Sequence, residues 1–528
     1  MAADVNIVQH ERTDMFYSIL FPNNKQYGEK RNYDAPKYFK DLNIDQIINA
    51  CLRNKKEYGL ESFFMTPLSD DEVIRYRQDV FKDLENDSIK TLFMDFSVRV
   101  AQIGRYMGQK WDEVKNGKVK ENRYISYGRI LDYAGQYCDA IKKISDGLTS
   151  LNLSSQGLNG FKDYLKEYVF QGVYKDFTDS VYKLRDMFGK LEYCMLIKHD
   201  TIRVKKFEGQ EDLTEKLISI FSPFAGSNAK DYRHKIQDEP YADYVEDSVL
   251  AMLSKLYRDE FMQLEAFCEK YKDFGDEIII RFSNEIQFYL LWLNLVNDLR
   301  QAGLNFCYPE VSHEVKHIYA IAGFDLALAR EKYRDTITND FEIKEPEHII
   351  AISGPNNGGK TTFAREFGQM NYLASLGLCV PGREASLFLF DNIYTHFGRE
   401  EITHATDGKL QDDLVRIHDI LMQATGKSII IVNEIFASTT LNDALTLGGH
   451  MMDKFAELGC PCVVVTFLDE LANHGSDTVS MMSTIYKDDP SKRTYKIVRK
   501  PPDGLAYAMT IAGKHGLTYD EVVRRIGK

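Results

Sequence analysis

The fold is decided by residues 348–361, which read His348-Ile349-Ile350-Ala351-Ile352-Ser353-Gly354-Pro355-Asn356-Asn357-Gly358-Gly359-Lys360-Thr361. The first six residues predict a buried strand, and the stretch from Thr361 to Met370 predicts the helix that follows it. Between them lies the pattern G-x-x-x-x-G-K-T, in the strand, loop and helix context that a phosphate-binding loop requires. We therefore predict a P-loop that holds a nucleoside triphosphate.

The chemistry of such a loop assigns a role to each residue type. Glycines let backbone N–H groups face the phosphates, and the helix N-terminus adds partial positive charge. Lys360 would reach the β- and γ-phosphates, and the Thr361 hydroxyl would bind Mg²⁺, so ATP and Mg²⁺ are the expected cofactors. The predicted nucleotide-binding residues are Gly354, Pro355, Asn356, Asn357, Gly358, Gly359, Lys360, Thr361 and Thr362.

A second apolar strand ends in polar residues, as the partner element of a P-loop does. It reads Ser428-Ile429-Ile430-Ile431-Val432-Asn433-Glu434, with Asn433 where an aspartate is expected. Glu434 is suited to orient and deprotonate the attacking water and is the candidate catalytic residue. Asn433 can accept a hydrogen bond from a metal-bound water but adds no negative charge. The sequence thus favours nucleotide binding over fast hydrolysis.

The rhythm of the chain predicts its organisation. Apolar β-rich runs at 349–352, 429–432 and 462–466 alternate with helical stretches, which indicates an α/β domain with a mostly parallel sheet and helices on both faces. From about residue 70 to 300 apolar residues recur at three- and four-residue spacing, which predicts a mainly α-helical domain. We expect an N-terminal segment at 1–64, a helical domain at 65–303 and the α/β domain at 304–528.

One part of the helical region predicts a small β-hairpin within residues 193–208. Met195 to Phe207 is rich in strand-forming residues, with His199-Asp200 near the turn. Arg203, Lys205 and Lys206 give it a basic edge. Two interpretations stay open: a solvated edge that lysines protect from pairing, and a contact with a nucleic-acid backbone.

Composition narrows the class of protein. The 528 residues have no apolar run of the roughly 18 residues that a membrane span needs, and the N-terminus lacks a secretory pattern. The eight cysteines show no zinc-like spacing, so we expect a cytoplasmic protein with reduced thiols. A net charge of −13 excludes a chain-wide basic footprint, although a local basic patch suffices for DNA.

The sequence resembles the MutS family of DNA mismatch-repair ATPases. The loop matches the family pattern G-P-N-x-G-G-K-[S/T], and 376–381 and 390–395 resemble the segment that follows the loop helix. Similar likenesses occur at 433–440, at 503–508 and, more weakly, at 66–68 and 74–78. The resemblance implies a homodimer in which two ATPase domains share composite sites, and helical levers that pass the nucleotide state to a clamp on DNA. The hairpin is a candidate reduced clamp.

Several positions depart from the family pattern. Only about 65 residues precede the core, too few for the mismatch-binding and connector domains, and Phe267-Cys268-Glu269 and Phe455-Ala456-Glu457 lie in helical stretches that predict core phenylalanines rather than a mismatch wedge. The chain is closer in layout to the shorter branch of the family. We also expect it to be without the C-terminal nuclease-like domain that some members of that branch carry.

Two departures concern the nucleotide. The family's T-H reads Thr466-Phe467, and the family's S-T-F aligns near Gly408-Lys409-Leu410. Gly408 and Lys409 are therefore the expected contacts to the partner subunit's nucleotide, where Lys409 either offers a cation to the γ-phosphate or is simply solvated.

Two hypotheses follow from the sequence. The first is a MutS-like ATP-switched dimeric clamp that acts on DNA, on mismatches or on recombination intermediates. The second is a nucleotide-gated interaction protein for a non-DNA partner such as a ribonucleoprotein, which the acidic charge favours. A small-molecule kinase is disfavoured, because the helical region shows no pattern of a substrate pocket.

Overall fold

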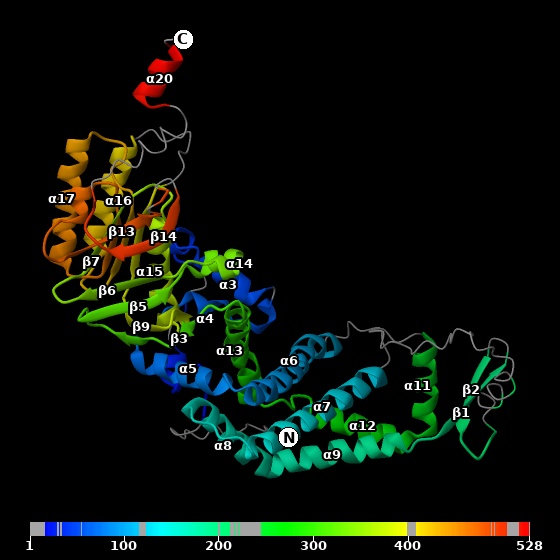
Figure 1. Ribbon diagram of the computed structural model, residues 1–528. Coiled ribbons are helices and arrows are strands. Elements are labelled where there is room, and N and C mark those ends of the chain that lie inside the picture. The colour runs from blue at the N-terminus through cyan, green and yellow to red at the C-terminus, as the bar shows by residue number, and fades with distance from the viewer. Residues whose placement is uncertain are drawn as a thin grey trace. The chain divides into compact units, whose positions relative to one another are not determined.

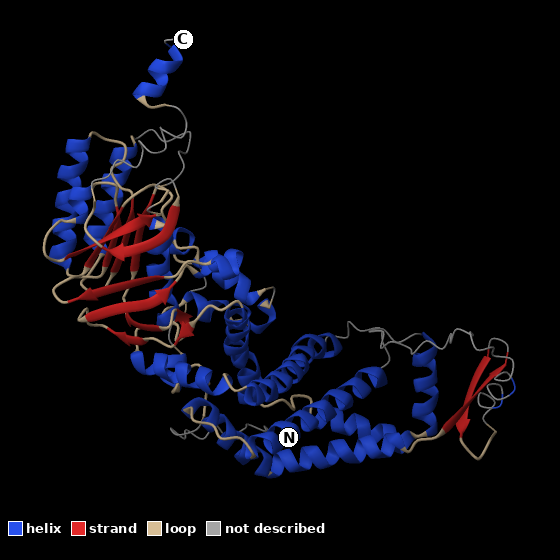
Figure 2. Cartoon of the chain, viewed as in Figure 1, coloured by secondary structure: helices blue, strands red, loops and turns tan. Residues whose placement is uncertain are grey.

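The structure, a computed structural model, describes residues 16–28, 31, 34–53, 55–115, 123–198, 201–211, 216, 220, 244–398, 408–486, 488–489, 492–503 and 517–526 (Figure 1). It contains two compact units. The first comprises Met1–Lys90, Leu153–Gly160 and Asn284–Lys528, and the second comprises Thr91–Asn152 and Phe161–Ser283. Strands gather in the first unit and in one separate hairpin of the second (Figure 2). The N-terminal part is thus largely helical and the C-terminal part is α/β, as predicted.

The compact units do not follow the expected boundaries at residues 64 and 303. Helix α5 (Asp71–Leu84) belongs to the first unit because Arg77 Nη1 donates to the Leu376 carbonyl at 3.0 Å. The C-terminal part of helix α13 (Glu277–Gln301) joins it too, since Trp292 Nε1 donates to Cys379 Sγ at 3.3 Å. These buried side chains link helices to the α/β part, so contact groups residues that the sequence pattern separates.

A six-stranded sheet forms the centre of the first unit. Its order is β10-β11-β12-β7-β13-β14, and all neighbouring strands are parallel except the last pair. The strands are β7 (Ile349–Ser353), β10 (Ile393–Phe397), β11 (Ile429–Asn433), β12 (Cys462–Val465), β13 (Thr478–Ile485) and β14 (Arg493–Arg499). This confirms a mostly parallel sheet, and it brings the carboxyl ends of five strands to one edge.

Helices cover both faces of this sheet. Helices α16 (Lys409–Gln423), α17 (Leu441–Leu458) and α18 (Asp469–Ala472) pack on one face, where Ile430 and Val464 meet Ile417 and Met452. The opposite face meets α15 (Lys360–Ser375), where Gly368 lies so close to Ile431 that a Cβ would approach it to 2.8 Å. Successive strand residues alternate between these two apolar layers, which explains why the strands read as continuous apolar runs.

Smaller elements complete the first unit. A four-stranded sheet has the order β4-β9-β5-β6 and a two-stranded sheet pairs β3 with β8. Their bounds are β3 (Phe306–Cys307), β4 (Glu310–Ser312), β5 (His317–Gly323), β6 (Asn339–Lys344), β8 (Val380–Pro381) and β9 (Glu384–Phe388). The remaining helices are α1 (Asn24–Tyr27), α2 (Tyr38–Asp41), α3 (Ile44–Leu52), η1 (Lys56–Tyr58), α4 (Glu61–Met65), α14 (Leu326–Lys332), η3 (Tyr333–Asp335) and α20 (Tyr519–Ile526).

The segment from α2 to α4 packs against α15. Arg365 Nε donates to the Asp41 carbonyl at 2.9 Å, and Gln369 Nε2 donates to the Leu42 carbonyl at 2.8 Å. Tyr372 OH donates to the Phe64 carbonyl at 2.7 Å. One face of the helix that follows the glycine-rich loop is therefore covered by residues more than 300 positions earlier.

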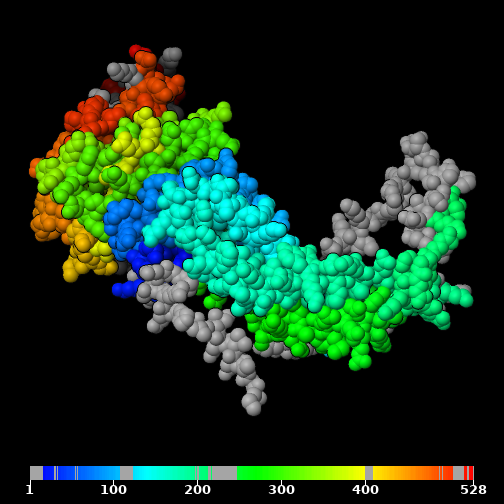
Figure 3. Space-filling view, turned by 90° about the horizontal axis from the view of Figure 1, so that it is seen from below, coloured from blue at the N-terminus to red at the C-terminus, as the bar shows by residue number. Residues whose placement is uncertain are grey.

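The second unit is a group of long helices around an aromatic core. They are the Thr91–Lys115 part of α6 (Asp87–Lys115), α7 (Arg123–Thr149), the end of α8 (Gln156–Phe170), α9 (Gly172–Gly189), α11 (Tyr244–Leu256), α12 (Arg258–Lys270) and the start of α13. Phe161 and Phe282 stack with ring centroids 3.4 Å apart. Several of these helices form a continuous surface in the space-filling view (Figure 3). Residues 271–276 separate α12 from α13.

The hairpin consists of β1 (Tyr193–Lys198) and β2 (Thr201–Lys206), which pair antiparallel. It is confirmed, and its expected turn at His199-Asp200 lies outside the described residues. Phe267 and Phe455 are buried in α12 and α17, as predicted for core residues. Among the described helices, none has both the length and the apolarity needed to cross a bilayer.

Candidate functional site

Residues Gly354–Thr361, here called the glycine loop, connect β7 to α15 at the carboxyl edge of the main sheet. The strand, loop and helix context predicted from the sequence is therefore present. Gly354 and Gly359 have φ angles of 111° and 92°, which only glycine adopts easily. Gly358 is buried against Ser483 of β13, so closely that a Cβ would lie 2.4 Å from Ser483 Oγ. Glycine is required here both for backbone conformation and for close approach.

Lys360 lies buried inside the loop, with 4% of its surface exposed. Its Nζ donates to the carbonyls of Gly354 at 2.8 Å and Pro355 at 3.2 Å. Burial lowers the pKa of Lys360, the nearby Glu434 carboxylate acts against this, and the Arg493 guanidinium lowers the pKa further. The ammonium is thus held where the loop closes, with one acidic and one basic side chain near it.

The two motif elements meet through a direct contact. Thr361 Oγ1 donates a hydrogen bond of 2.9 Å to Asn433 Oδ1, at the end of β11. The two residues predicted to act around Mg²⁺ are therefore adjacent, and Thr362 follows them, partly buried, on the same turn of α15. The hydroxyl and amide oxygens are hard donors of the kind that Mg²⁺ prefers. These oxygens would fit this ion, with the Thr361 hydroxyl as the expected ligand.

Glu434 is exposed at the edge of the sheet. Its N–H donates to the Val465 carbonyl at 2.9 Å, and its φ of 53° lies in the left-handed region. Phe436, two residues on, has a φ of 59° and is buried. Non-glycine residues in this region carry strain that clusters at functional sites. The backbone turns sharply here, and it leaves the carboxylate in solvent while it anchors the next apolar side chains.

The remaining predicted residues follow β12 or lie at the start of α16. Phe467 follows β12 and is 46% exposed, and Thr466 N–H donates to the Ile352 carbonyl at 3.0 Å. Gly408 is the N-cap residue of α16, with an extended backbone. Lys409 begins that helix, but its side chain lies outside the described residues, as do 399–407 and most of the 503–508 stretch.

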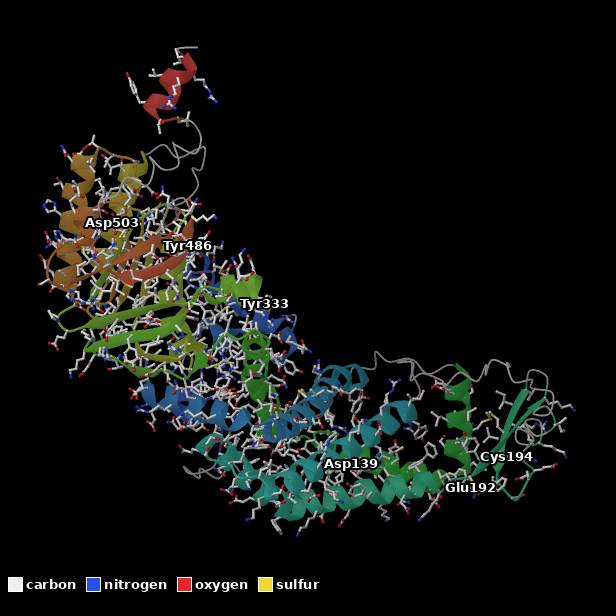
Figure 4. All side chains as sticks on the ribbon, in the orientation of Figure 1. Asp139, Glu192, Cys194, Tyr333, Tyr486 and Asp503 are labelled. Atoms are coloured by element: carbon white, nitrogen blue, oxygen red, sulfur yellow. The ribbon has the colours of Figure 1, made fainter. Side chains whose placement is uncertain are left out.

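Sequence reasoning missed the wall that β13 and β14 build beside the loop. Ser483 backs Gly354 and Gly358, Arg493 contacts the Asn356 carbonyl, and Tyr495 lies 3.7 Å from the position of a Gly359 Cβ. Tyr486 follows β13 at the turn toward β14 (Figure 4). These residues come more than 120 positions after the loop, and they carry no motif. Only the pairing of β13 with β7 brings them there.

A buried acid lies one turn beyond the glycine loop on α15. Glu366 is 1% exposed, and its Oε1 has no hydrogen-bond partner among the described residues. Burial raises the pKa of Glu366 well above its usual range; Asp325 and Asp340 add to this and Lys496 opposes it. Asp325 Oδ1 is occupied by Gln369 Nε2 at 2.8 Å. Burial therefore favours the neutral form of the Glu366 side chain.

The hairpin presents two chemically different faces. Val204 packs against Leu253, Tyr257 and Phe261, and Lys206 Nζ lies 5.1 Å from the Tyr257 ring centroid on this side. Opposite pairs Leu196 with Arg203 and Cys194 with Lys205 lie on the other face, with Lys198 beside them. Lys198, Arg203 and Lys205 are exposed, and we call them the basic face. Lys206, which the sequence groups with them, points the other way because strand residues alternate.

Helix α16 carries exposed apolar side chains. Leu414, Val415 and Met422 are 39%, 51% and 73% exposed, whereas Ile417 and Ile420 are buried on the sheet. Their spacing places them on one outward side of the helix. Leu441, at the start of α17, is 60% exposed. Clusters of this kind mark surfaces that bind another protein.

The described residues contain no group of three or more His, Cys, Asp or Glu side chains that could hold a metal ion. All eight cysteines are free thiols. At the glycine loop the Thr361 hydroxyl remains the expected ligand of Mg²⁺, and Asn433 the expected partner of a metal-bound water.

Comparisons with known proteins identify similar sequences. Residues 350–525 match the family described as MutS domain V. The DNA mismatch repair protein MutS of Thermotoga neapolitana is 22% identical over 462 residues, which are 82% of this chain and 55% of that protein. The same protein of Thermotoga sp. (strain RQ2) is 22% identical over 518 residues, 92% of this chain and 62% of that protein. Endonuclease MutS2 of Thermus thermophilus is 28% identical over 193 residues, 36% and 26% of the two chains. The chain spans about half the length of the MutS relatives that it matches over most of its own length.

Proposed function

Because the chain belongs to the MutS family, we propose that it is an ATP-binding protein that works as a nucleotide-switched dimeric clamp on DNA, with slow hydrolysis. The observation that carries this proposal is the contact of Thr361 with Asn433 beside a buried Lys360. This contact joins the glycine loop, which would bind the phosphates, to the end of β11, which would lie beside the metal ion. This is the arrangement that triphosphate binding requires.

The same geometry supports slow turnover. Glu434 is placed at the carboxyl edge, where it would orient water for attack on the γ-phosphate. Asn433 supplies an oxygen but no negative charge for Mg²⁺. The exposed Phe467 occupies the place of a histidine that would sense the terminal phosphate. Nucleotide binding is therefore expected to be the switch, and hydrolysis its slow reset.

The hairpin supports a contact with DNA. A two-stranded antiparallel ribbon fits the major groove of duplex DNA, and cations on its outer face can neutralise phosphates. The two strands contain no acidic residue, and the basic face points away from the apolar layer formed with α11. On a chain of net charge −13 this is a local patch of the kind that an acidic DNA-binding protein needs.

The outward side of α16 supports a homodimer through the ATPase domains. The N-cap residue of this helix is Gly408, which the family resemblance places at the partner subunit's nucleotide. Its exposed Leu414, Val415 and Met422 would be covered by a second copy of the chain. Closing two such domains around ATP would link the nucleotide state to the helical unit.

Binding measurements on the full chain would test the proposal. A fluorescent ATP analogue is expected to bind the parent protein, and Lys360→Met is expected to lose this binding. Duplex and four-way DNA are then titrated at several salt concentrations, with and without ATP. We expect the affinity for DNA to depend on ATP. We also expect the logarithm of the association constant to fall linearly with the logarithm of the salt concentration, with a slope of about −0.9 for each phosphate contacted.

The alternative function remains a nucleotide-gated interaction protein for a partner such as a ribonucleoprotein, and the net charge of −13 favours it. ATP binding with no affinity for any DNA form at low salt, together with binding to RNA or ribonucleoprotein, would support this alternative. Absence of ATP binding would overturn both functions.

A further inference from the structure

Arg493, the first residue of β14, lies against the middle of the glycine loop. Its Nε donates a hydrogen bond of 3.2 Å to the Asn356 carbonyl. Its charge also reaches Lys360, whose pKa it lowers after the larger effect of burial. A guanidinium therefore lies within electrostatic range of the phosphate-binding ammonium, from a strand outside the loop motif.

The backbone around Arg493 is built to hold it there. Ile485 pairs with Arg493 but Ser483 pairs with Ile497, so β14 contains two more residues than β13 over this stretch and bulges. Thr494 Oγ1 donates to the Thr484 carbonyl at 2.9 Å and fixes one side of the bulge. Tyr495 takes a φ of 59° at its apex. A bulge of this type redirects side chains next to functional sites.

A second anchor fixes the far side of the bulge. Asn339 of β6 accepts the Ile497 N–H at 2.9 Å, and its Nδ2 donates to the Tyr495 carbonyl at 3.5 Å. The apex residue lies beside Gly359, where an added Cβ would come within 3.7 Å of the Tyr495 backbone. The bulge thus contacts the glycine loop at Asn356 and borders it at Gly359.

The contact with Asn356 orients a peptide group. In a trans peptide the C=O and the following N–H point in opposite directions. The Asn356 carbonyl faces the Arg493 guanidinium, so the Asn357 N–H points away from β14, toward the opposite side of the loop. Asn357 itself has a φ of 57°, in the left-handed region, so the backbone turns between Asn357 and Gly358. Successive inward N–H groups make the concave surface that binds anions.

The charge balance of the site gives the guanidinium a second effect. Among the described residues, the charged side chains that shift the pKa of Lys360 are the Glu434 carboxylate and the Arg493 guanidinium. Asn433 adds no charge, so Mg²⁺ is held less strongly than it would be beside an aspartate. A fixed cation behind the loop offsets part of the phosphate charge that the metal would otherwise neutralise.

We propose, on the basis of the proposed ATP-binding function, that Arg493 is a positioning residue that turns the Asn356–Asn357 peptide toward the triphosphate of bound ATP and offsets part of its charge. It acts through the loop backbone and not on the nucleotide base. Its ligand class is the polyphosphate chain, with or without a nucleoside.

The experiment measures nucleotide binding by the full chain and three variants. A fluorescent ATP analogue is titrated into the parent, Arg493→Met, Arg493→Lys and Arg499→Gln, and inorganic tripolyphosphate is used as the competitor. Arg499 is the matched control, because it is exposed on the same strand and pairs with Glu347 away from the loop. Melting temperatures of all four proteins check that each variant is folded.

We expect Arg493→Met to bind both ATP and tripolyphosphate about tenfold more weakly, the loss of one charge-assisted hydrogen bond. Arg493→Lys should recover part of the affinity, and Arg499→Gln should match the parent. Unchanged ATP affinity in folded Arg493→Met would overturn the proposal. So would a loss for ATP without a loss for tripolyphosphate, which would place the effect at the base. Failure of the parent protein to bind ATP would overturn the proposed function, and the Arg493 proposal with it. ATP binding by the parent with unchanged affinity in Arg493→Met would overturn the Arg493 proposal alone.

Discussion

The Thr361 hydroxyl donates a 2.9 Å hydrogen bond to Asn433 Oδ1, which joins the first turn of α15 to the end of β11. An aspartate at this position could accept the same bond and would add a negative charge next to the metal. The amide keeps the contact and omits the charge. The hydrogen bond therefore keeps the glycine loop and β11 in contact, while residue 433 adds no negative charge that would attract Mg²⁺.

Restoring the charge should restore metal affinity. We expect Asn433→Asp to bind Mg²⁺ about tenfold more tightly in the presence of ATP, the scale of effects around bound metals. Titration of Mg²⁺ against the ATP hydrolysis rate measures this, and the hydrolysis rate at saturating Mg²⁺ should rise too. Asn392→Asp is the control, since Asn392 precedes β10 at the opposite end of the parallel strands. An unchanged Mg²⁺ requirement would show that residue 433 has no influence on the metal.

Removing the candidate base should separate binding from turnover. Glu434→Gln keeps the size of an exposed side chain, so ATP affinity and melting temperature should stay near those of the parent. The hydrolysis rate should fall by at least about 100-fold, because general bases contribute that much or more. Single-turnover hydrolysis of radiolabelled ATP is the measurement. A variant that hydrolyses ATP at the parental rate would exclude Glu434 as the catalytic residue.

The two faces of the hairpin should respond differently to charge removal. We expect replacement of both Arg203 and Lys205 by Gln to weaken duplex binding and to reduce the salt slope by about 0.9 for each lost phosphate contact. Lys206→Gln is the matched control, because Lys206 lies over the Tyr257 ring on the other face. Equal losses for the control and the double variant would indicate a general charge effect and not a contact made by the basic face.

The buried Glu366 should make stability depend on pH. Its pKa is raised by burial, so above about pH 4.3 the unfolded chain releases a proton that the folded chain retains. The parent is thus expected to lose stability as pH rises from that value toward the folded pKa. Glu366→Gln removes this dependence. The melting temperature of the variant should therefore exceed that of the parent by a margin that grows with pH, at about 1–2 °C per kcal/mol for a unit of this size.

The control for this prediction is Glu331→Gln, because Glu331 is exposed on α14. Thermal melts of the parent and both variants between pH 4 and pH 8 would settle the sign. A difference between Glu366→Gln and the parent that shrinks as pH rises would contradict a raised pKa.

Local patterns predicted much of the fold. The strand, loop and helix around Gly354 were evident because continuous apolar residues and a glycine-rich turn act over short distances. The hairpin follows from the same local preferences. The face on which Lys206 lies did not follow from composition, since it depends on the pairing register.

Long-range pairing placed the parts that the sequence did not reveal. Ser483, Arg493 and Tyr495 reach the glycine loop only because β13 pairs with β7 and β14 bulges. No local sequence motif predicts the bulge in β14 or the order of the strands in the sheet. The expected boundaries at 64 and 303 likewise rest on changes of pattern along the chain, whereas the contacts of Arg77 and Trp292 join residues across them.

The packing of residues 38–64 on α15 has a consequence for how this protein can be dissected. A fragment that began at residue 304 would lose Phe39 and Leu42, which are 1% and 0% exposed, and each such side chain contributes about 1.5–3 kcal/mol by burial. It would also leave Arg365, Gln369 and Tyr372 without the carbonyls that they now bind. The unit that contains the glycine loop is therefore discontinuous in sequence, and substitutions among residues 38–64 are expected to act on the loop through α15.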